Sequence, residues 1–184
     1  MHDNNNYKWI TKVKEILNNT GNSQYWLLQD HLTPKSINKK VKRSLLDQNI
    51  QRWNDAMSLS SKGQFYRTIK QNIEFEKYLK ILQFSQALPI YKLRTANHYF
   101  PIETGRWNGT AMTNRLCTLC NRNEIGNEKH YLFHCELFSY ERTKFTTSIS
   151  CTPVLLSQIF NLTSFPNLRL FSQFASVLVK RVTR

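Results

Sequence analysis

The chain has 184 residues and a formal charge of +14, from 26 basic and 12 acidic side chains. A hydrophobic fraction of 40% excludes a protein that is disordered throughout, and only five glycines and five prolines disfavour an all-β fold built on tight turns. The positive charge makes RNA or DNA the first partner to consider, the alternative being a basic surface that contacts only solvent.

No apolar run approaches the length of a membrane span, and the polar residues 1–6 lack the apolar core of a cleavable signal. We therefore expect an intracellular protein, in the nucleus or the cytoplasm, with no membrane contact. Four cysteines would permit two disulfides in a secreted protein, but in a reducing compartment they favour a metal site.

Apolar residues three and four apart predict a first short helix near residues 9–17, which ends in the polar residues 18–21. Thr33 and Pro34 predict the start of a longer helix, because Thr is a good cap and Pro suits the first helical position. One face of this helix carries apolar residues from Ile37 to Met57. Four basic residues cover much of its remaining surface and are candidate nucleic-acid contacts: Lys39, Lys40, Lys42 and Arg43.

Residues 60–63 interrupt the helical pattern, which returns over 64–82 and again over 87–99. The latter helix is expected to end before Pro101, since the residue before a proline avoids helical angles. Residues 101–115 are predicted as a loop, 117–126 as a turn or small hairpin, and 128–138 as helical. A final amphipathic helix is predicted over 166–182, with its apolar stripe on Leu168, Phe171, Ala175, Leu178 and Val182.

A C-x2-C-x9-H-x4-C motif places three thiols and one imidazole within a short window: Cys117, Cys120, His130 and Cys135. Zn²⁺ takes four such ligands at tetrahedral angles, and a full set leaves no position for substrate. The motif therefore predicts one structural zinc ion. The alternatives are scattered core thiols, or His134 in place of His130. Cys151 is left over, and we expect it to be a small buried side chain.

Enzyme motifs are missing from the sequence. It has no GxxxxGK[ST] loop, no GxSxG and no HExxH. A zinc deaminase needs an HxE before its CxxC, and here the CxxC comes first. Glu124 and Glu128 lie inside the zinc loop, where we expect them to compensate the charge of a helix N-terminus. The sequence thus indicates a non-enzymatic protein.

Four segments of the chain form a recognisable pattern. They read LRTANH (93–98), PIETGRW (101–107), CTLC (117–120) and EKHYLFHC (128–135). The pattern resembles the zinc-binding region downstream of the polymerase in reverse transcriptases of non-LTR retrotransposons, over residues 93–142. The resemblance implies that the four residues of the motif are the zinc ligands and that the module binds template RNA or target DNA near a polymerase domain. The paired aspartates of that polymerase do not occur here, so the chain resembles the terminal piece of such a polyprotein: a remnant, a fragment or a captured domain.

The sequence as a whole predicts a mostly α protein, a small helical bundle with a Cys3His zinc-knuckle-like module. We expect a basic helical N-terminal region over 1–62 and a helical domain over 63–184, which holds the zinc module at about 93–142 and the C-terminal helix. Arg94, Arg106 and Trp107 are further candidate nucleic-acid contacts, although Trp107 could anchor a loop and Arg106 could pair with Glu103. The rival hypothesis is a structural or protein-interaction domain in which zinc only stabilises the fold.

Overall fold

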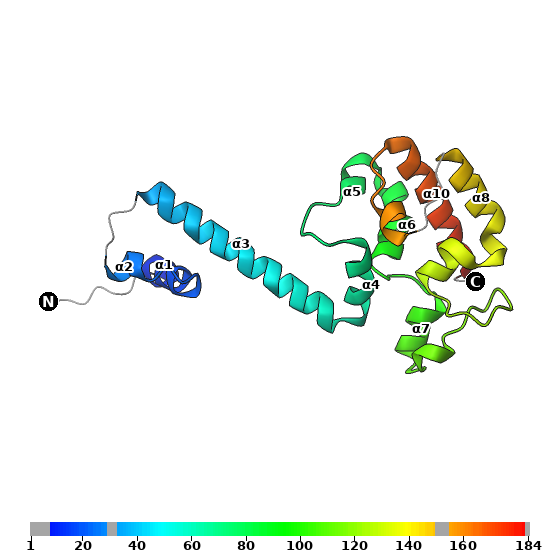
Figure 1. Ribbon diagram of the computed structural model, residues 1–184, viewed down its shortest axis with the longest axis horizontal. Coiled ribbons are helices and arrows are strands. Elements are labelled where there is room, and N and C mark those ends of the chain that lie inside the picture. Colours follow the sequence, from blue (N-terminus) through cyan, green and yellow to red (C-terminus); the bar gives the residue numbers. More distant parts are fainter. Residues whose placement is uncertain (1–7, 29–32, 150–154, 183–184) are drawn as a thin grey trace. The chain divides into compact units, whose positions relative to one another are not determined.

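A computed structural model describes residues 8–28, 33–149 and 155–182 (Figure 1). This part of the chain is mostly helical and contains one isolated antiparallel bridge, Leu116 to Ile125, in place of a sheet. The expected helical fold class is therefore confirmed. The chain divides into two compact units, Met1–Ala56 and Met57–Arg184, so the predicted boundary at 62/63 falls a few residues inside the second unit. None of the described helices combines the length and the apolar character needed to cross a bilayer.

The first unit contains α1 (Lys8–Asn19), α2 (Gln24–Leu27) and most of α3 (Pro34–Leu59). Helix α1 packs on α2 and ends in a turn with Gly21 at a φ of +68°, a left-handed angle that suits glycine. Helix α3 begins at Pro34, as predicted, and Lys40 of α3 donates a 2.6 Å hydrogen bond from its Nζ to the Tyr25 hydroxyl of α2. The apolar face expected on α3 is not buried in the described structure: Leu45 is 44% exposed and Leu46 is 56% exposed.

The second unit contains the remaining elements. In chain order they are α4 (Ser61–Ile69), α5 (Lys77–Ile81), α6 (Phe84–Arg94), α7 (Pro101–Trp107), the short turns η1 (Met112–Asn114), η2 (His130–His134) and η3 (Glu136–Phe138), then α8 (Ser139–Ser148), α9 (Leu156–Phe160) and α10 (Phe165–Val182). The core of this unit lies around α10, which packs against α6 and α8.

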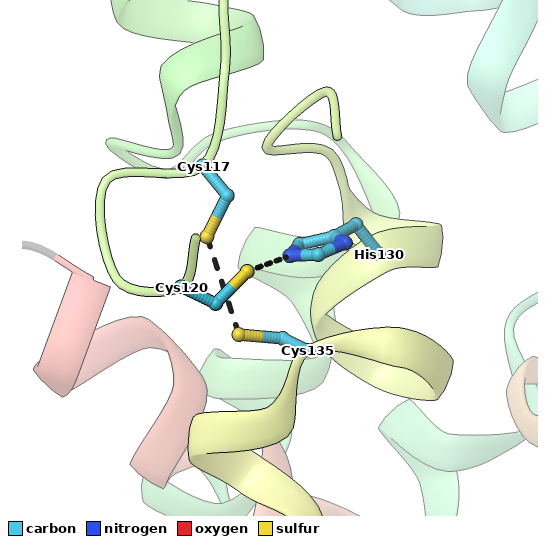
Figure 2. Close-up of side chains that lie close together, drawn as sticks. All are labelled: Cys117, Cys120, His130 and Cys135. Carbon is cyan, nitrogen blue, oxygen red and sulfur yellow. Dashed lines mark hydrogen bonds between the residues drawn. The ribbon is translucent and has the colours of Figure 1, made fainter. Parts of the chain in front are cut away.

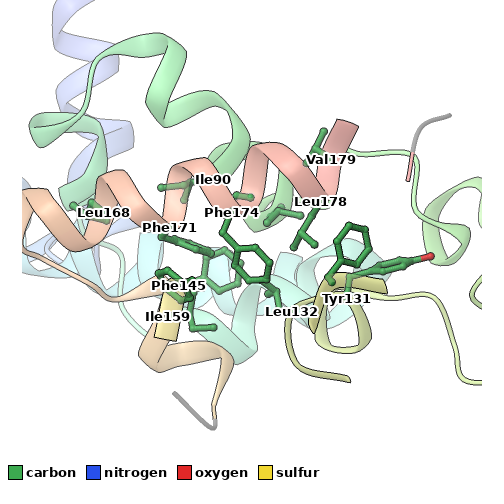
Figure 3. Packing of buried hydrophobic residues seen from close by; sticks show 14 of the residues in the cluster. Ile90, Tyr131, Leu132, Phe145, Ile159, Leu168, Phe171, Phe174, Leu178 and Val179 are labelled. Carbon is green, nitrogen blue, oxygen red and sulfur yellow. The ribbon is translucent and has the colours of Figure 1, made fainter. Parts of the chain in front are cut away.

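The stripe predicted on α10 forms the centre of that core (Figure 3). Phe171 is fully buried and makes a T-shaped contact with the Phe160 ring of α9, with ring centroids 5.3 Å apart. Phe145 of α8 stacks on Phe174 at 5.5 Å. Ser172 donates a 2.6 Å hydrogen bond to the backbone carbonyl of Gln86, which fastens α10 to α6. Six apolar side chains of α10 are buried, and burying one the size of Phe contributes about 1.5–3 kcal/mol, so α10 supplies a large share of the apolar stabilisation of this unit.

One predicted helix is wrong in its extent. Residues 64–82 do not form a single helix, because α4 ends at Ile69 and α5 begins only at Lys77. Lys70, which follows α4, has extended backbone angles, and its side chain bonds the Glu74 carbonyl and the Glu76 carboxylate. These local contacts, together with the ion pair of Glu76 with Arg94 of α6, hold the intervening residues as a loop despite their helical spacing.

The prediction for residues 87–115 also needs correction. Helix α6 ends at Arg94 rather than near Tyr99, since Ala96 has a φ of +50° and the Asn97 N–H returns to the Lys92 carbonyl at 2.8 Å. These are the marks of a Schellman C-cap. Residues 101–107 form α7 where a loop was expected, with Pro101 at the first position and Glu103 in the first turn. Both are favourable signals for a helix start.

Candidate metal centre

The structure brings the four motif residues together in one cluster (Figure 2). One ligand atom from each of Cys117, Cys120, His130 and Cys135 lies within 4.8 Å of all the others. The sulfurs of Cys117 and Cys135 are 4.0 Å apart, and the sulfur of Cys120 lies 3.4 Å from the Nε2 of His130. Tetrahedral Zn²⁺ with ordinary bond lengths requires S–S and S–N separations of about 3.8 and 3.6 Å. The donor set and its spacing therefore fit a zinc ion.

The first two ligands are carried by a small hairpin, as predicted for 117–126. Leu116 and Ile125 form its bridge, and the Cys117 N–H donates a 2.8 Å bond to the Glu124 carbonyl. Within the turn the Leu119 N–H points at the Cys117 sulfur, at 3.4 Å. The two-residue gap of the CxxC motif thus turns both thiols toward the same point.

The other two ligands come from a helical turn that is not a regular α-helix. The Cys135 N–H bonds the His130 carbonyl at 2.8 Å, which is an i→i+5 bond, and Cys135 itself is extended with a ψ of 124°. The helical pattern predicted over 128–138 is therefore broken at Cys135, between η2 and η3. Widened turns of this kind often occur at functional sites, and here the turn lets His130 and Cys135 face the same cluster.

Arg142 of α8 holds that turn from outside. Its Nε donates to the Leu132 carbonyl at 2.8 Å, and its Nη2 donates to the Cys135 carbonyl at 2.7 Å. Both carbonyls lie where the helical turn ends, and the Cys135 carbonyl also accepts the Phe138 N–H of η3 at 3.3 Å. The guanidinium therefore stabilises the backbone that positions Cys135.

Glu124 fixes the orientation of the imidazole. Its carboxylate oxygen lies 2.8 Å from the His130 Nδ1, which leaves Nε2 facing the sulfurs. Metal-bound histidines ordinarily donate their second ring N–H to such a carboxylate. The hydrogen bond with His130 also lowers the pKa of Glu124. The sequence predicts for Glu124 only a role at a helix N-terminus and not this contact. A carboxylate six residues before a histidine ligand is nevertheless a pattern from which the contact could be predicted.

His130, and not His134, is the nitrogen of the cluster. His130 is buried, and its backbone N–H is held by the Asn127 side-chain oxygen at 2.8 Å. The side chain of His134 is exposed and is not part of the cluster. Cys151, the leftover thiol, lies outside the described residues.

The thiols have unequal acidities. Burial works to raise the pKa of Cys117, but the neighbouring Tyr131 hydroxyl and the N–H groups of Leu119 and Cys120 lower it to about 7. Burial and the charges of the other two thiols raise the pKa of Cys135 to about 12, in spite of the Leu137 N–H. Crowded sulfurs repel one another as thiolates, and a divalent cation among them would relieve that repulsion.

A second buried pair, His98 and Glu128, supports the turn that carries His130 and Cys135. The Nε2 of His98 lies 2.9 Å from the Glu128 carboxylate, and its Nδ1 accepts the Phe100 N–H at 3.3 Å. The His98 ring stacks on Phe100, and Phe100 makes an edge-type ring contact with Tyr131, the residue after His130. Glu128 thus anchors the start of the ligand-bearing turn to the segment after α6, a role that the sequence alone did not suggest.

The candidate nucleic-acid contacts have different surroundings. Lys39, Lys40, Lys42 and Arg43 are exposed on α3. Trp107 is 52% exposed and meets the 61% exposed Tyr99 edge to face, at 5.5 Å. Arg106 pairs with Glu103, the alternative considered from the sequence, and donates a 2.7 Å bond to the Ser61 hydroxyl.

Arg94 does not lie at a surface. It is 2% exposed, donates a 2.8 Å bond to the Phe160 carbonyl and pairs with Glu76 at 2.9 Å. Arg94 is therefore not a contact for a phosphate backbone that runs along the surface, although it lines a pocket of this unit. Its place in the fold is to join α6 to α9 and to the residue before α5.

Comparison of the chain with known family models, with curated proteins and with solved structures yields no match. The interpretation of this centre therefore rests on its donor set and geometry. What these establish is a possible metal site of three cysteines and one histidine, whose ligand types and spacing suggest zinc.

Proposed function

We propose that the chain is a non-enzymatic module in which one structural zinc ion stabilises a helical fold that binds RNA or DNA through its phosphate backbone. The observation that carries the proposal is the group of four exposed basic side chains on α3, Lys39 to Arg43. Among the ion pairs of the described residues, none involves these four. Their charge is therefore available to an external anion.

The proposed role of zinc is structural. Four protein ligands leave no position for a water or a substrate, so the ion would supply folding energy rather than chemistry. Zinc binding in small modules contributes on the order of 10 kcal/mol, comparable to the whole stability of a domain. Zinc would hold the hairpin of Cys117 and Cys120 to the turn of His130 and Cys135.

Nucleic-acid binding through α3 has a calculable signature. Each neutralised phosphate releases counterions, so four contacts give a slope of about −3.6 in log K against log salt for duplex DNA, and about −2.8 for single strands. Between 50 and 200 mM salt the affinity would fall roughly 50- to 150-fold. The second unit adds an independent element, since the exposed rings of Trp107 and Tyr99 offer faces on which unpaired bases stack.

The resemblance to the zinc-binding region of retrotransposon reverse transcriptases supports the same proposal. In that setting the ligand would be template RNA or target DNA, and a polymerase domain would be the neighbouring partner. Arg94 is no longer among the proposed contacts because it is buried.

A protein-interaction module is the second candidate, and α3 favours it as well. Leu45, Leu46 and Ile50 remain substantially exposed along this helix. Exposed apolar side chains on one helix face are typical of a surface that docks on another protein. The two candidate functions differ in one expected result: removing the charges of α3 should lower the affinity for nucleic acid only if α3 binds nucleic acid.

The test measures binding of labelled single-stranded RNA and duplex DNA by fluorescence anisotropy across a salt series. One variant changes the α3 cations to Gln (Lys39, Lys40, Lys42 and Arg43), and a matched variant changes four exposed cations of the second unit (Lys80, Lys129, Lys144 and Arg169). Both variants have the same formal charge. The proposal expects only the α3 variant to lose affinity and flatten the salt slope. Undetectable binding of the unaltered protein at low salt, or equal losses in both variants, would overturn it.

A further inference from the structure

A pocket of about 420 Å³ lies in the second unit, away from the metal centre. It is formed by the loop between α4 and α5, residues 68–78, and by residues 157–162 at and after α9. Its volume is at the lower end of the range for small-molecule sites, about 300–1,000 Å³. The pocket therefore has room for a small ligand rather than for a polymer.

The charges at this pocket are not balanced. Glu76 accepts from Lys70 at 2.6 Å and from Arg94 at 2.9 Å, so one carboxylate faces two cations. The Tyr66 hydroxyl, at 2.7 Å, is a further donor to the same carboxylate. Burial works to raise the pKa of Glu76, but hydrogen bonds from Lys70 and Tyr66 and the charge of Arg94 hold it below its ordinary value, so the group is an anion. Glu74 and Lys77 also line the pocket, so its three cations face two carboxylates and one positive charge is in excess.

That excess charge is poorly solvated. The side chains of Lys70 and Arg94 are 12% and 3% exposed. Three rings surround the guanidinium carbon of Arg94, those of Tyr66, Tyr78 and Phe160, at 5.7–5.8 Å. Within the described structure the Arg94 Nε has no hydrogen-bond partner. A buried cation without full compensation is costly, and an anion bound beside it would lower that cost.

The lining of the pocket is suited to a ligand with many oxygen atoms. Lys77, an exposed cation at the start of α5, lines the pocket together with Lys70. Gln71, Asn72 and Asn161 line it too and carry side-chain amides. A phosphate group offers three oxygens to such donors, more than a carboxylate does. Phe75, which is 63% exposed, adds a ring at the same pocket.

We propose that this pocket binds a phosphomonoester, with the phosphate beside Lys70 and Lys77 and the organic part toward Phe75. The phosphomonoester can come from a free mononucleotide or from the 5′ end of a strand. The proposal is independent of the binding function assigned to α3, because no residue of α3 lines this pocket.

The experiment titrates the zinc-loaded full chain by calorimetry with adenosine monophosphate, with inorganic phosphate and with adenosine. Both phosphate-bearing ligands should bind. The affinity for adenosine should be roughly ten- to a hundredfold lower than for its monophosphate, because adenosine lacks the charged group that accepts the hydrogen bonds. Short strands that carry a 5′-phosphate or a 5′-hydroxyl then show which molecule supplies the phosphomonoester. If adenosine monophosphate binds and neither strand does, the ligand is a free nucleotide. If the 5′-phosphorylated strand binds more tightly than the 5′-hydroxyl strand, the ligand is a strand end.

Two pocket variants and one control locate the site. Lys70→Gln and Lys77→Gln should each weaken binding of the monophosphate roughly tenfold or more, because each removes a charged donor. Lys144→Gln, an exposed cation of α8 outside the pocket, should stay within about twofold. Since Lys70 also bonds Glu76, the exposed Lys77 decides the result if Lys70→Gln unfolds. No heat with either phosphate ligand, equal binding of adenosine, or an equal loss in Lys144→Gln would overturn the proposal.

Discussion

Replacing the two neighbouring histidines separates the metal ligand from a surface residue. His130 supplies the one nitrogen of the cluster and is buried, whereas His134 is exposed. We expect His130→Ala to lose tight zinc binding and His134→Ala to keep it. The pair changes the same residue type within one turn, so each variant is the control for the other.

The size of the effect follows from the ligand count. A structural site worth about 10–16 kcal/mol, shared among four ligands, gives about 2.5–4 kcal/mol for each. His130→Ala should therefore weaken zinc binding roughly 100- to 1,000-fold, at about 1.4 kcal/mol for each factor of ten. The loss also removes the edge-to-face contact of the imidazole with Tyr131, at 5.3 Å, so the fold of residues 115–140 should loosen with it.

The assay is a competition between the protein and a chromophoric chelator for zinc, with the metal-to-protein ratio measured by native mass spectrometry. Circular dichroism of the same samples reports the helical content. One zinc per chain is expected for the unaltered protein and for His134→Ala. A zinc-free unaltered protein, or a His130→Ala variant that holds zinc as tightly as the unaltered chain, would refute the reasoning.

Three further predictions concern the support of this centre and the core. Glu124→Ala should weaken zinc binding about tenfold without unfolding the chain, since it frees the His130 ring; unchanged affinity in the chelator competition would contradict that role. Phe171→Ala should lower the free energy of unfolding by about 3–5 kcal/mol in urea titrations, because its ring is fully buried, and a loss below about 1 kcal/mol would show that α10 is not the core. Gly126→Ala should cost about 1–3 kcal/mol in the same titration, since its added carbon would lie 2.8 Å from the Pro101 ring; a neutral result would mean that the hairpin yields easily.

The local patterns of the sequence determined much of this protein. The spacing of Cys117, Cys120, His130 and Cys135 predicted a cluster that the structure assembles, because tight turns bring nearby residues to one point regardless of the rest of the fold. The stripe on α10 and the start of α3 at Pro34 were equally readable, since a helix period and a cap are local properties. The helix start at Pro101 is also a local signal, although the sequence analysis predicts a loop over 101–115.

Tertiary structure alone decided the rest. The sequence predicts Arg94 as a surface contact. The structure buries it, because the Phe160 carbonyl and Glu76, which lie far along the chain, bind its guanidinium. The Glu76 carboxylate, which pairs with both Arg94 and Lys70, also helps to hold residues 70–76 as a loop, so α4 ends at Ile69 although the helical spacing continues in the sequence. Helix α3 shows the opposite case, a patterned face with no buried residue in the described structure. The physical reason is that the energy of a charge or an apolar face depends on its partner, which lies far along the chain, whereas caps, turns and ligand spacing depend on a few adjacent residues.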